Sequence, residues 1–214
     1  MVKHREVMED ISDVYLTEYI PSMYTSPCTL YYLQNGKQKK WHIFAERNGV
    51  VIIVYNKTRD VLILVKQFRP SVYLQRIPEE DRHGKIDVGK YPAKLGVTLE
   101  WCAGLEDKDI STEEVAQEEI LEECGYSVQI QQLERIGTIR NLSVTTGARS
   151  TYYYCEVTDD MRVNSGGGEA GEHVEVLEMP VKDVVDYASN TEYVSSPINF
   201  MYGLYWFLSN KYKK

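Results

Sequence analysis

The stretch that most constrains the fold of this chain is the acidic segment 104–126, GLEDKDISTEEVAQEEILEECGY. Ser111, with Glu114 three residues later, forms a capping-box pattern that predicts the start of a helix. Gly125 predicts its end, because glycine readily adopts the left-handed backbone that follows a helix. Apolar residues recur every fourth position inside this helix and predict a stripe that packs on a sheet. These residues are Ala116, Ile120 and Cys124.

The same helix carries three glutamates, Glu119, Glu122 and Glu123, at spacings that place them on one face. Carboxylates this close repel one another unless a cation neutralises them. Hard divalent cations such as Mg²⁺ or Mn²⁺ prefer carboxylate oxygens, so this face is a candidate metal-binding edge. The alternative is a solvated acidic surface, which is common on glutamate-rich helices.

This segment resembles the Nudix box, a motif of one glycine, one glutamate and an Arg-Glu-x-x-Glu-Glu-x-Gly run at fixed spacing. The matching positions are Gly104, Glu119, Ile120, Glu122, Glu123, Gly125 and Tyr126. Two positions depart from the pattern, because Ile110 replaces the first glutamate and Glu118 replaces the arginine. In the family these two residues usually pair with each other. Their joint absence leaves a catalytically silent Nudix-fold binding module as an alternative.

The resemblance implies a metal-dependent hydrolase. It assigns Glu119, Glu122 and Glu123 to catalysis and to Mg²⁺ binding, with Mn²⁺ also possible. The backbone carbonyl of Ala103, just before the box glycine, is a further expected metal ligand. Water activated by the metal would then attack a diphosphate linkage.

A later glycine-rich loop, residues 164–172, supplies another expected catalytic group. In the wider family a glutamate on this loop binds metal or takes the proton from the attacking water. Glu172 lies at the best-matching position, and Glu169 is the alternative. Glycines allow such a loop to close over a site and open again. A solvated linker carboxylate is the simpler interpretation of either residue.

Strand-like runs surround the box. Asn35-Gly36 predicts a tight turn within a hairpin over 29–46. Residues 49–56 and 60–67 are nearly continuous in apolar residues and predict strands that are buried on both faces. A long irregular loop is expected over 76–96. Further strands are expected over 98–102, 128–139, 150–157 and 173–180. Helices are expected from Pro180 to Ala188 and from Ser196-Pro197 onward.

These elements, read with the resemblance, predict an α/β protein with the Nudix fold. We expect an α/β/α sandwich with a mixed sheet and an N-terminal β-hairpin extension. Residues 1–45 would form an N-terminal arm and hairpin that dimerises the protein, and residues 46–214 would form the Nudix domain.

Three residues outside the box are expected to bind the substrate. The Gln67-Phe68-Arg69-Pro70 segment resembles the strand end of Nudix enzymes that hydrolyse nucleoside diphosphate sugars and ADP-ribose. Arg69 would bind phosphate oxygens through its planar guanidinium, although a surface arginine is the alternative. Glu100 aligns with a family position near the substrate, and a structural role is equally open. Trp41 resembles an aromatic that stacks on the nucleobase from a second subunit; a buried strand tryptophan is the alternative.

The expected substrate follows from one more position. ADP-ribose-specific relatives typically carry a proline where this chain has Leu142. Its absence favours the UDP-sugar pyrophosphatases, which this chain resembles from about residue 29 onward. The expected reaction converts UDP-glucose to UMP and glucose 1-phosphate. The alternative is ADP-ribose cleavage to AMP and ribose 5-phosphate.

Composition limits the partners and the compartment. The net charge of −8 argues against a nucleic-acid partner. The four cysteines lack the paired short spacing of a zinc site, and reduced thiols fit best. The first residues are too charged for a signal peptide, and no apolar run reaches the roughly 18 residues of a membrane span. We expect a cytoplasmic homodimer that binds neither nucleic acid nor membrane.

Overall fold

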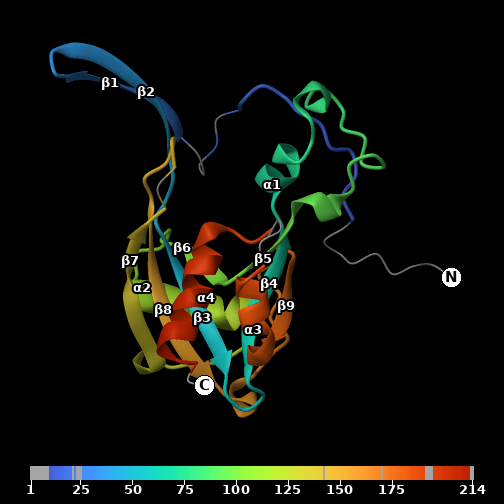
Figure 1. Cartoon of the computed structure of the whole chain (residues 1–214), viewed down its shortest axis with the longest axis vertical. Coiled ribbons are helices and arrows are strands. Elements are labelled where there is room, and N and C mark those ends of the chain that lie inside the picture. The colour runs from blue at the N-terminus through green and yellow to red at the C-terminus, as the bar shows by residue number, and fades with distance from the viewer. Residues whose placement is uncertain are drawn as a thin grey trace.

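The computed structural model describes residues 10–20, 22, 26–141, 143–169, 171–190 and 195–212. Figure 1 shows a sheet covered by helices on both faces, with a separate hairpin that projects from one end. The strands are β1 (Ser26–Gln34), β2 (Lys37–Ala45), β3 (Gly49–Asn56), β4 (Val61–Phe68), β5 (Val97–Glu100), β6 (Cys102–Leu105), β7 (Leu133–Arg140), β8 (Arg149–Val157) and β9 (Val174–Pro180). The helices are α1 (Pro70–Gln75), α2 (Thr112–Glu119), α3 (Val181–Ala188) and α4 (Ile198–Asn210). This arrangement confirms the predicted mixed-sheet sandwich.

The sheet is mixed, and its centre is β3. The main path runs β5-β4-β3-β8-β7, in which β3 and β8 are parallel and the other pairs are antiparallel. β3 and most of β4 are buried on both faces, as their continuous apolar sequences predict. One hydrophobic cluster lies between the sheet and α2, and a second lies between the sheet and the helices α3 and α4.

The sheet divides at Trp101, which is buried between β5 and β6. β5 pairs with β4, whereas β6 pairs with β3, so one short stretch of chain passes from one half of the sheet to the other. The Trp101 ring stacks on Phe200 of α4, and its indole Nε1 donates to the Phe200 carbonyl at 3.0 Å. Gly203 lies against the same ring, because a Cβ there would stand 2.4 Å from Nε1.

The box helix begins and ends as predicted. Ser111 is the N-cap: its side chain accepts from the Glu114 backbone N–H, and the Glu114 carboxylate accepts from the Ser111 N–H. After Glu119 the helix continues as one π-helical turn, Ile120–Cys124. Gly125 then adopts a left-handed backbone with φ 78°. The predicted stripe of Ala116, Ile120 and Cys124 is fully buried.

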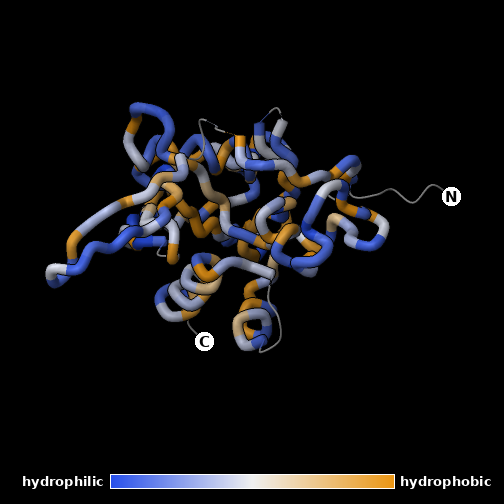
Figure 2. Tube along the Cα trace, turned by 90° about the horizontal axis from the view of Figure 1, so that it is seen from above, coloured by the Kyte–Doolittle hydropathy of each residue, from blue (hydrophilic) through white to orange (hydrophobic). Residues whose placement is uncertain are grey.

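The hairpin β1–β2 turns at Asn35-Gly36, where both residues have positive φ as a type I′ turn requires. Among the described strands, β1 and β2 pair only with each other, and nearly all of their residues are exposed. The base of the hairpin is held by the Phe44 N–H, which donates to the Thr145 carbonyl at 2.9 Å. Hydrophilic residues follow one strand of the projecting hairpin (Figure 2).

The region between β4 and β5 is more ordered than the irregular loop expected over 76–96. It contains α1 and two short 3₁₀ turns, and it has a small hydrophobic cluster of its own. Tyr73, Ile77, Ile86 and Tyr91 form that cluster, and Ile11 packs against it. Apolar residues at irregular spacing thus build a compact insertion that periodicity does not reveal.

Some predicted boundaries were wrong. The single strand expected over 98–102 is two strands, β5 and β6, divided at Trp101. The strand expected over 128–139 begins only at Leu133, because residues 130–132 form a 3₁₀ turn. The last helix begins at Ile198, with Pro197 as the N-cap in place of Ser196. Among the described residues no helix has the length and apolar character needed to cross a membrane.

Candidate carboxylate site

The box glycine lies directly beneath a glutamate. A Cβ at Gly104 on β6 would stand 1.8 Å from Oε1 of Glu119, so only glycine leaves room for this carboxylate. The close approach places Glu119 over the sheet, although its helix lies in the adjacent layer. This contact gives the spacing between Gly104 and Glu119 in the sequence a physical reason.

Glu123 is hydrogen-bonded to β6, the strand that carries Gly104. Its Oε2 accepts the Ala103 backbone N–H at 3.0 Å, and the residue is only 4% exposed. β6 and the π-helical turn are therefore joined at the point where the two expected metal-binding segments meet. The role of the Ala103 carbonyl remains a prediction.

The two glutamates resist ionisation. Burial, followed by the charges of Glu123, Glu122 and Glu172, raises the pKa of Glu119 to about 8. Burial also raises the pKa of Glu123 to about 7, against the hydrogen bond from Ala103. Carboxyl groups with pKa values near neutrality gain most from a bound cation, which would remove both the repulsion and the proton.

The glycine-rich loop lies across the end of the box helix. The Gly167 N–H donates to the Glu123 carbonyl at 2.9 Å, and the Gly168 N–H donates to the Glu122 carbonyl at 3.0 Å. A Cβ at Gly166 would stand 2.2 Å from the Glu123 carbonyl oxygen. These glycines thus permit close backbone packing, and this part of the loop is tied to the helix.

The loop brings both candidate bases to the site. Glu172 is close enough that its charge contributes to the raised pKa values of Glu119 and Glu123. Burial and the neighbouring Glu169 raise the pKa of Glu122. The structure therefore gathers the box glutamates, Glu169 and Glu172 at one place, and it does not by itself choose between the two loop residues as the base.

Arg69 is engaged by Glu100. Its Nε and Nη2 atoms donate to the two carboxylate oxygens of Glu100 at 2.8 and 2.7 Å. Burial alone would raise the pKa of Glu100, but the hydrogen bonds from Arg69 and Thr98 and the Arg69 charge lower it. Arg69 keeps 43% of its side chain exposed and lies within the field of Glu123 and Glu172. Glu100 therefore holds Arg69 beside the carboxylates.

Trp41 lies elsewhere. It is on the projecting hairpin and 47% exposed, so the alternative of a buried strand tryptophan is wrong for this chain. Its indole Nε1 donates to the Val144 carbonyl at 2.6 Å. The base-stacking role across a subunit boundary stays a prediction. Leu142, on which the substrate preference depends, lies outside the described residues.

Glu118, which replaces the arginine of the motif, forms an ion pair that the sequence did not reveal. Nζ of Lys108 lies 2.5 Å from the Glu118 carboxylate and joins the segment before the helix to the helix itself. The Lys108–Glu118 pair has the opposite polarity to the family's acid-to-arginine pair, and Ile110 is exposed. Lys108 lies ten residues before Glu118 and ahead of the helix. The spacing rules for helices therefore do not predict their contact.

The donor chemistry of the site fits a hard divalent cation, because it offers carboxylate and carbonyl oxygens. Within the described part of the chain, no three acidic, histidine or cysteine side chains already stand in a coordinating arrangement. The carboxylates that surround Gly104 carry raised pKa values, as expected for a group that is complete only with a cation.

Comparisons with known proteins identify relatives of this chain, although no family model matches it. The chain is 37% identical to uridine diphosphate glucose pyrophosphatase of Bos taurus over 215 residues, which covers 94% of this chain and 96% of the bovine protein. The Mus musculus protein of the same name is 35% identical with the same coverage. GDP-mannose pyrophosphatase of Salmonella arizonae is 30% identical over 164 residues, or 74% of each chain.

The fold also matches a solved structure. The crystal structure of an ADP compounds hydrolase superposes with a TM-score of 0.57 and covers 90% of this chain and 99% of the other. The two chains are 14% identical, so this likeness supports the fold alone.

Proposed function

The chain belongs to the Nudix hydrolases, as a nucleotide-sugar pyrophosphatase of that family, and on this premise we propose that its substrate is UDP-glucose. The observation that carries the proposal is the near full-length similarity to two proteins named for this substrate. Hydrolysis of the diphosphate linkage would yield UMP and glucose 1-phosphate. Glu119, Glu122, Glu123 and Glu172 are the proposed catalytic residues.

A divalent cation, Mg²⁺ or Mn²⁺, completes the proposed site. Glu119, Glu122, Glu123 and the Ala103 carbonyl would hold it. When bound, such an ion offsets the charge of the diphosphate and lowers the pKa of a water molecule. The Gly104 contact supports this assignment, because it keeps the Glu119 carboxylate where the backbone of β6 approaches the helix.

The chain's own residues then position the substrate and move the proton. Glu172, with Glu169 as the alternative, accepts the proton of the attacking water at a carboxylate oxygen. The water oxygen forms a bond to one phosphorus, and the bridging oxygen leaves with the other phosphate. Arg69 stabilises the charge that develops on the phosphate oxygens. Because Nε and Nη2 of Arg69 donate to Glu100, we assign the contact with the phosphate oxygens to Nη1.

Side-by-side hydrolysis assays with UDP-glucose, GDP-mannose and ADP-ribose test this proposal, each with magnesium and with a chelator. Turnover that favours UDP-glucose and disappears with the chelator is the expected result. A preference for ADP-ribose or GDP-mannose would keep the mechanism and overturn the substrate. Absence of turnover in folded protein would favour a catalytically silent binding module.

We further propose that residues 1–45 act as a dimerisation element ahead of a hydrolase domain formed by residues 46–214. The hairpin strands carry Lys37, Lys39 and Lys40 and no acidic residue, in a chain of net charge −8. A two-stranded hairpin without further packing is marginally stable in water. Its exposed apolar side chains would be buried by contact with a second copy, and its positive charge suits the acidic surface of that copy.

A further inference from the structure

Two arginines face each other at one end of the sheet. Arg140 on β7 and Arg149 on β8 are direct cross-strand partners, and both are exposed. Among the described residues neither guanidinium forms an ion pair; Nη1 of Arg140 donates to the Gly147 carbonyl at 3.2 Å. Like charges placed directly opposite each other destabilise a sheet, and a bound anion would remove this cost.

Both arginines belong to the sheet face that carries the carboxylates. Along β8, Tyr153 packs in the α2 layer, whereas Tyr152 and Tyr154 pack in the layer of α3 and α4. Side chains alternate along a strand, so Arg149 lies on the α2 side. The hydroxyls of Thr138 and Thr151 lie 3.1 Å apart and link the two strands on this side, two residues from each arginine.

The strand register places the arginine pair near the carboxylate site. Gly104 pairs with Val50, and Val50 pairs with Thr151, two residues from Arg149. Ordinary strand spacings then separate the Cα atoms of Gly104 and Arg149 by roughly 12 Å. Arg69 follows β4, on the opposite side of β3 from β8. The carboxylates therefore lie between Arg69 and the arginine pair.

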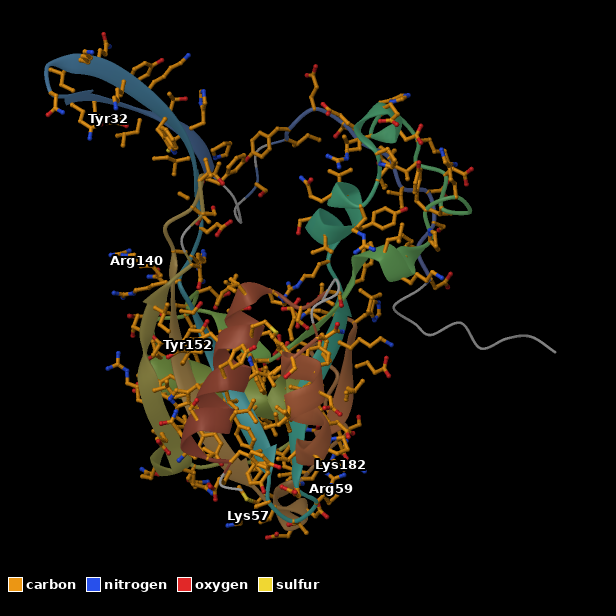
Figure 3. The ribbon with its side chains drawn as sticks, in the orientation of Figure 1. Tyr32, Lys57, Arg59, Arg140, Tyr152 and Lys182 are labelled. Atoms are coloured by element: carbon orange, nitrogen blue, oxygen red, sulfur yellow. The ribbon has the colours of Figure 1, made fainter. Side chains whose placement is uncertain are left out.

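The loop between the two arginines is joined to the hairpin that carries Trp41. The loop that joins Arg140 to Arg149 contains Val144, whose carbonyl accepts the indole N–H of Trp41. Figure 3 shows Arg140 at the end of the sheet from which the hairpin rises, far from Lys57 and Arg59 at the other end.

We propose that Arg140 and Arg149 bind the nucleoside monophosphate half of the nucleotide sugar. Guanidinium groups bind phosphate and carbonyl oxygens in preference to neutral hydroxyls, and uracil presents two carbonyl oxygens. The sugar phosphate half then lies toward Arg69. This inference rests on the proposed function and adds the residues that distinguish the two halves of the substrate.

The test measures the binding of the two products separately. UMP and glucose 1-phosphate are titrated as inhibitors of UDP-glucose hydrolysis, and UMP is also titrated calorimetrically. Arg149→Gln and Arg140→Gln should each weaken UMP binding about tenfold, the loss expected for one charged hydrogen bond. Glucose 1-phosphate should bind as before, and the KM for UDP-glucose should rise. Arg135→Gln, on the same strand as Arg140, is the control and should change none of these values.

The outcomes separate this inference from the proposed function. Unchanged UMP binding in both variants, or an equal loss of glucose 1-phosphate, would overturn the assignment. Calorimetry decides the inference even if UDP-glucose is not hydrolysed, because wild-type protein that binds no UMP also overturns it. Arg149→Lys keeps the charge and loses the planar fork, so it should give an intermediate loss. Thermal unfolding confirms that each variant is folded.

Discussion

The carboxylate of Glu119 occupies the space that a side chain at residue 104 would need. Gly104→Ala should therefore displace this carboxylate and lower kcat by at least about 100-fold, the loss typical of a misplacement near 1 Å. Gly147→Ala is the matched control, because a Cβ there meets no atom within 4 Å. Steady-state assays of both variants check the prediction, and equal activity in the two would contradict it.

Glu123→Gln should reduce turnover by about 100- to 1,000-fold, the range found when one electrostatic group is removed from an active site. The amide keeps the size of the carboxylate and retains an oxygen that can accept the Ala103 N–H, so the fold should persist. Circular dichroism and kcat measurements with magnesium test both statements. Glu80→Gln, at an exposed site in the insertion, is the control. Near-normal turnover of Glu123→Gln would remove the metal assignment.

The ion pair between Lys108 and Glu118 predicts that exchanging the two residues restores the activity that either single substitution loses. Lys108 and Glu118 now form an ion pair at 2.5 Å. Lys108→Glu and Glu118→Lys should each replace this pair with two like charges. The double variant should recover most of the lost kcat/KM. Both side chains are about half exposed, so the coupling energy should be only about 0.2–1 kcal/mol. A double-mutant cycle on kcat/KM and on Mn²⁺ affinity measures it, and additive losses would show that the pair has no role.

Stability without metal should fall as the pH rises. The pKa of Glu119 is raised to about 8 and that of Glu123 to about 7, above their values in the unfolded chain. The folded state thus binds protons more tightly, and the stability this gives is complete below about pH 4.5 and is lost as the pH rises to about 8. Thermal unfolding of chelator-treated protein between pH 5 and 8 tests this, and magnesium should restore the loss at pH 8. A Glu119→Gln variant with an unchanged pH slope would refute it.

The hairpin proposal predicts a dimer that one substitution disrupts. Leu30 and Trp41 are cross-strand neighbours with 51% and 47% exposure. Leu30→Asp should therefore shift the protein toward monomer in sedimentation velocity. Ile198→Asp changes an equally apolar side chain, 86% exposed on α4, and should leave the mass unchanged. A monomeric wild-type protein would exclude the proposed dimer.

Local signals in the sequence predicted much of this structure. The capping box at Ser111, the left-handed Gly125 and the turn at Asn35-Gly36 each depend on a few adjacent residues, and all three were confirmed. The buried strand β3 was also confirmed at its predicted bounds, because its apolar run is uninterrupted.

Contacts between distant residues escaped prediction. Arg69 and Glu100 are separated by 31 residues, and each received its own assignment before the structure showed them as a pair. Lys108 received no role, since it lies in an irregular segment before the helix. The insertion between β4 and β5 looked irregular because the apolar residues of its small core recur at no regular spacing. In each case the fold brings together residues that no periodic pattern relates.

Because the sheet divides at Trp101, the single segment 97–105 fixes the distance between two parts of the site. Glu100, which orients Arg69, and Gly104, which accommodates Glu119, lie on the two sides of Trp101 in one short stretch of backbone. Bond lengths and strand geometry therefore limit how far apart these two points can move. An inserted residue between them would turn every later side chain of β6 to the opposite face. Loops around this stretch can lengthen or shorten during evolution, whereas its own length cannot change without dismantling the site.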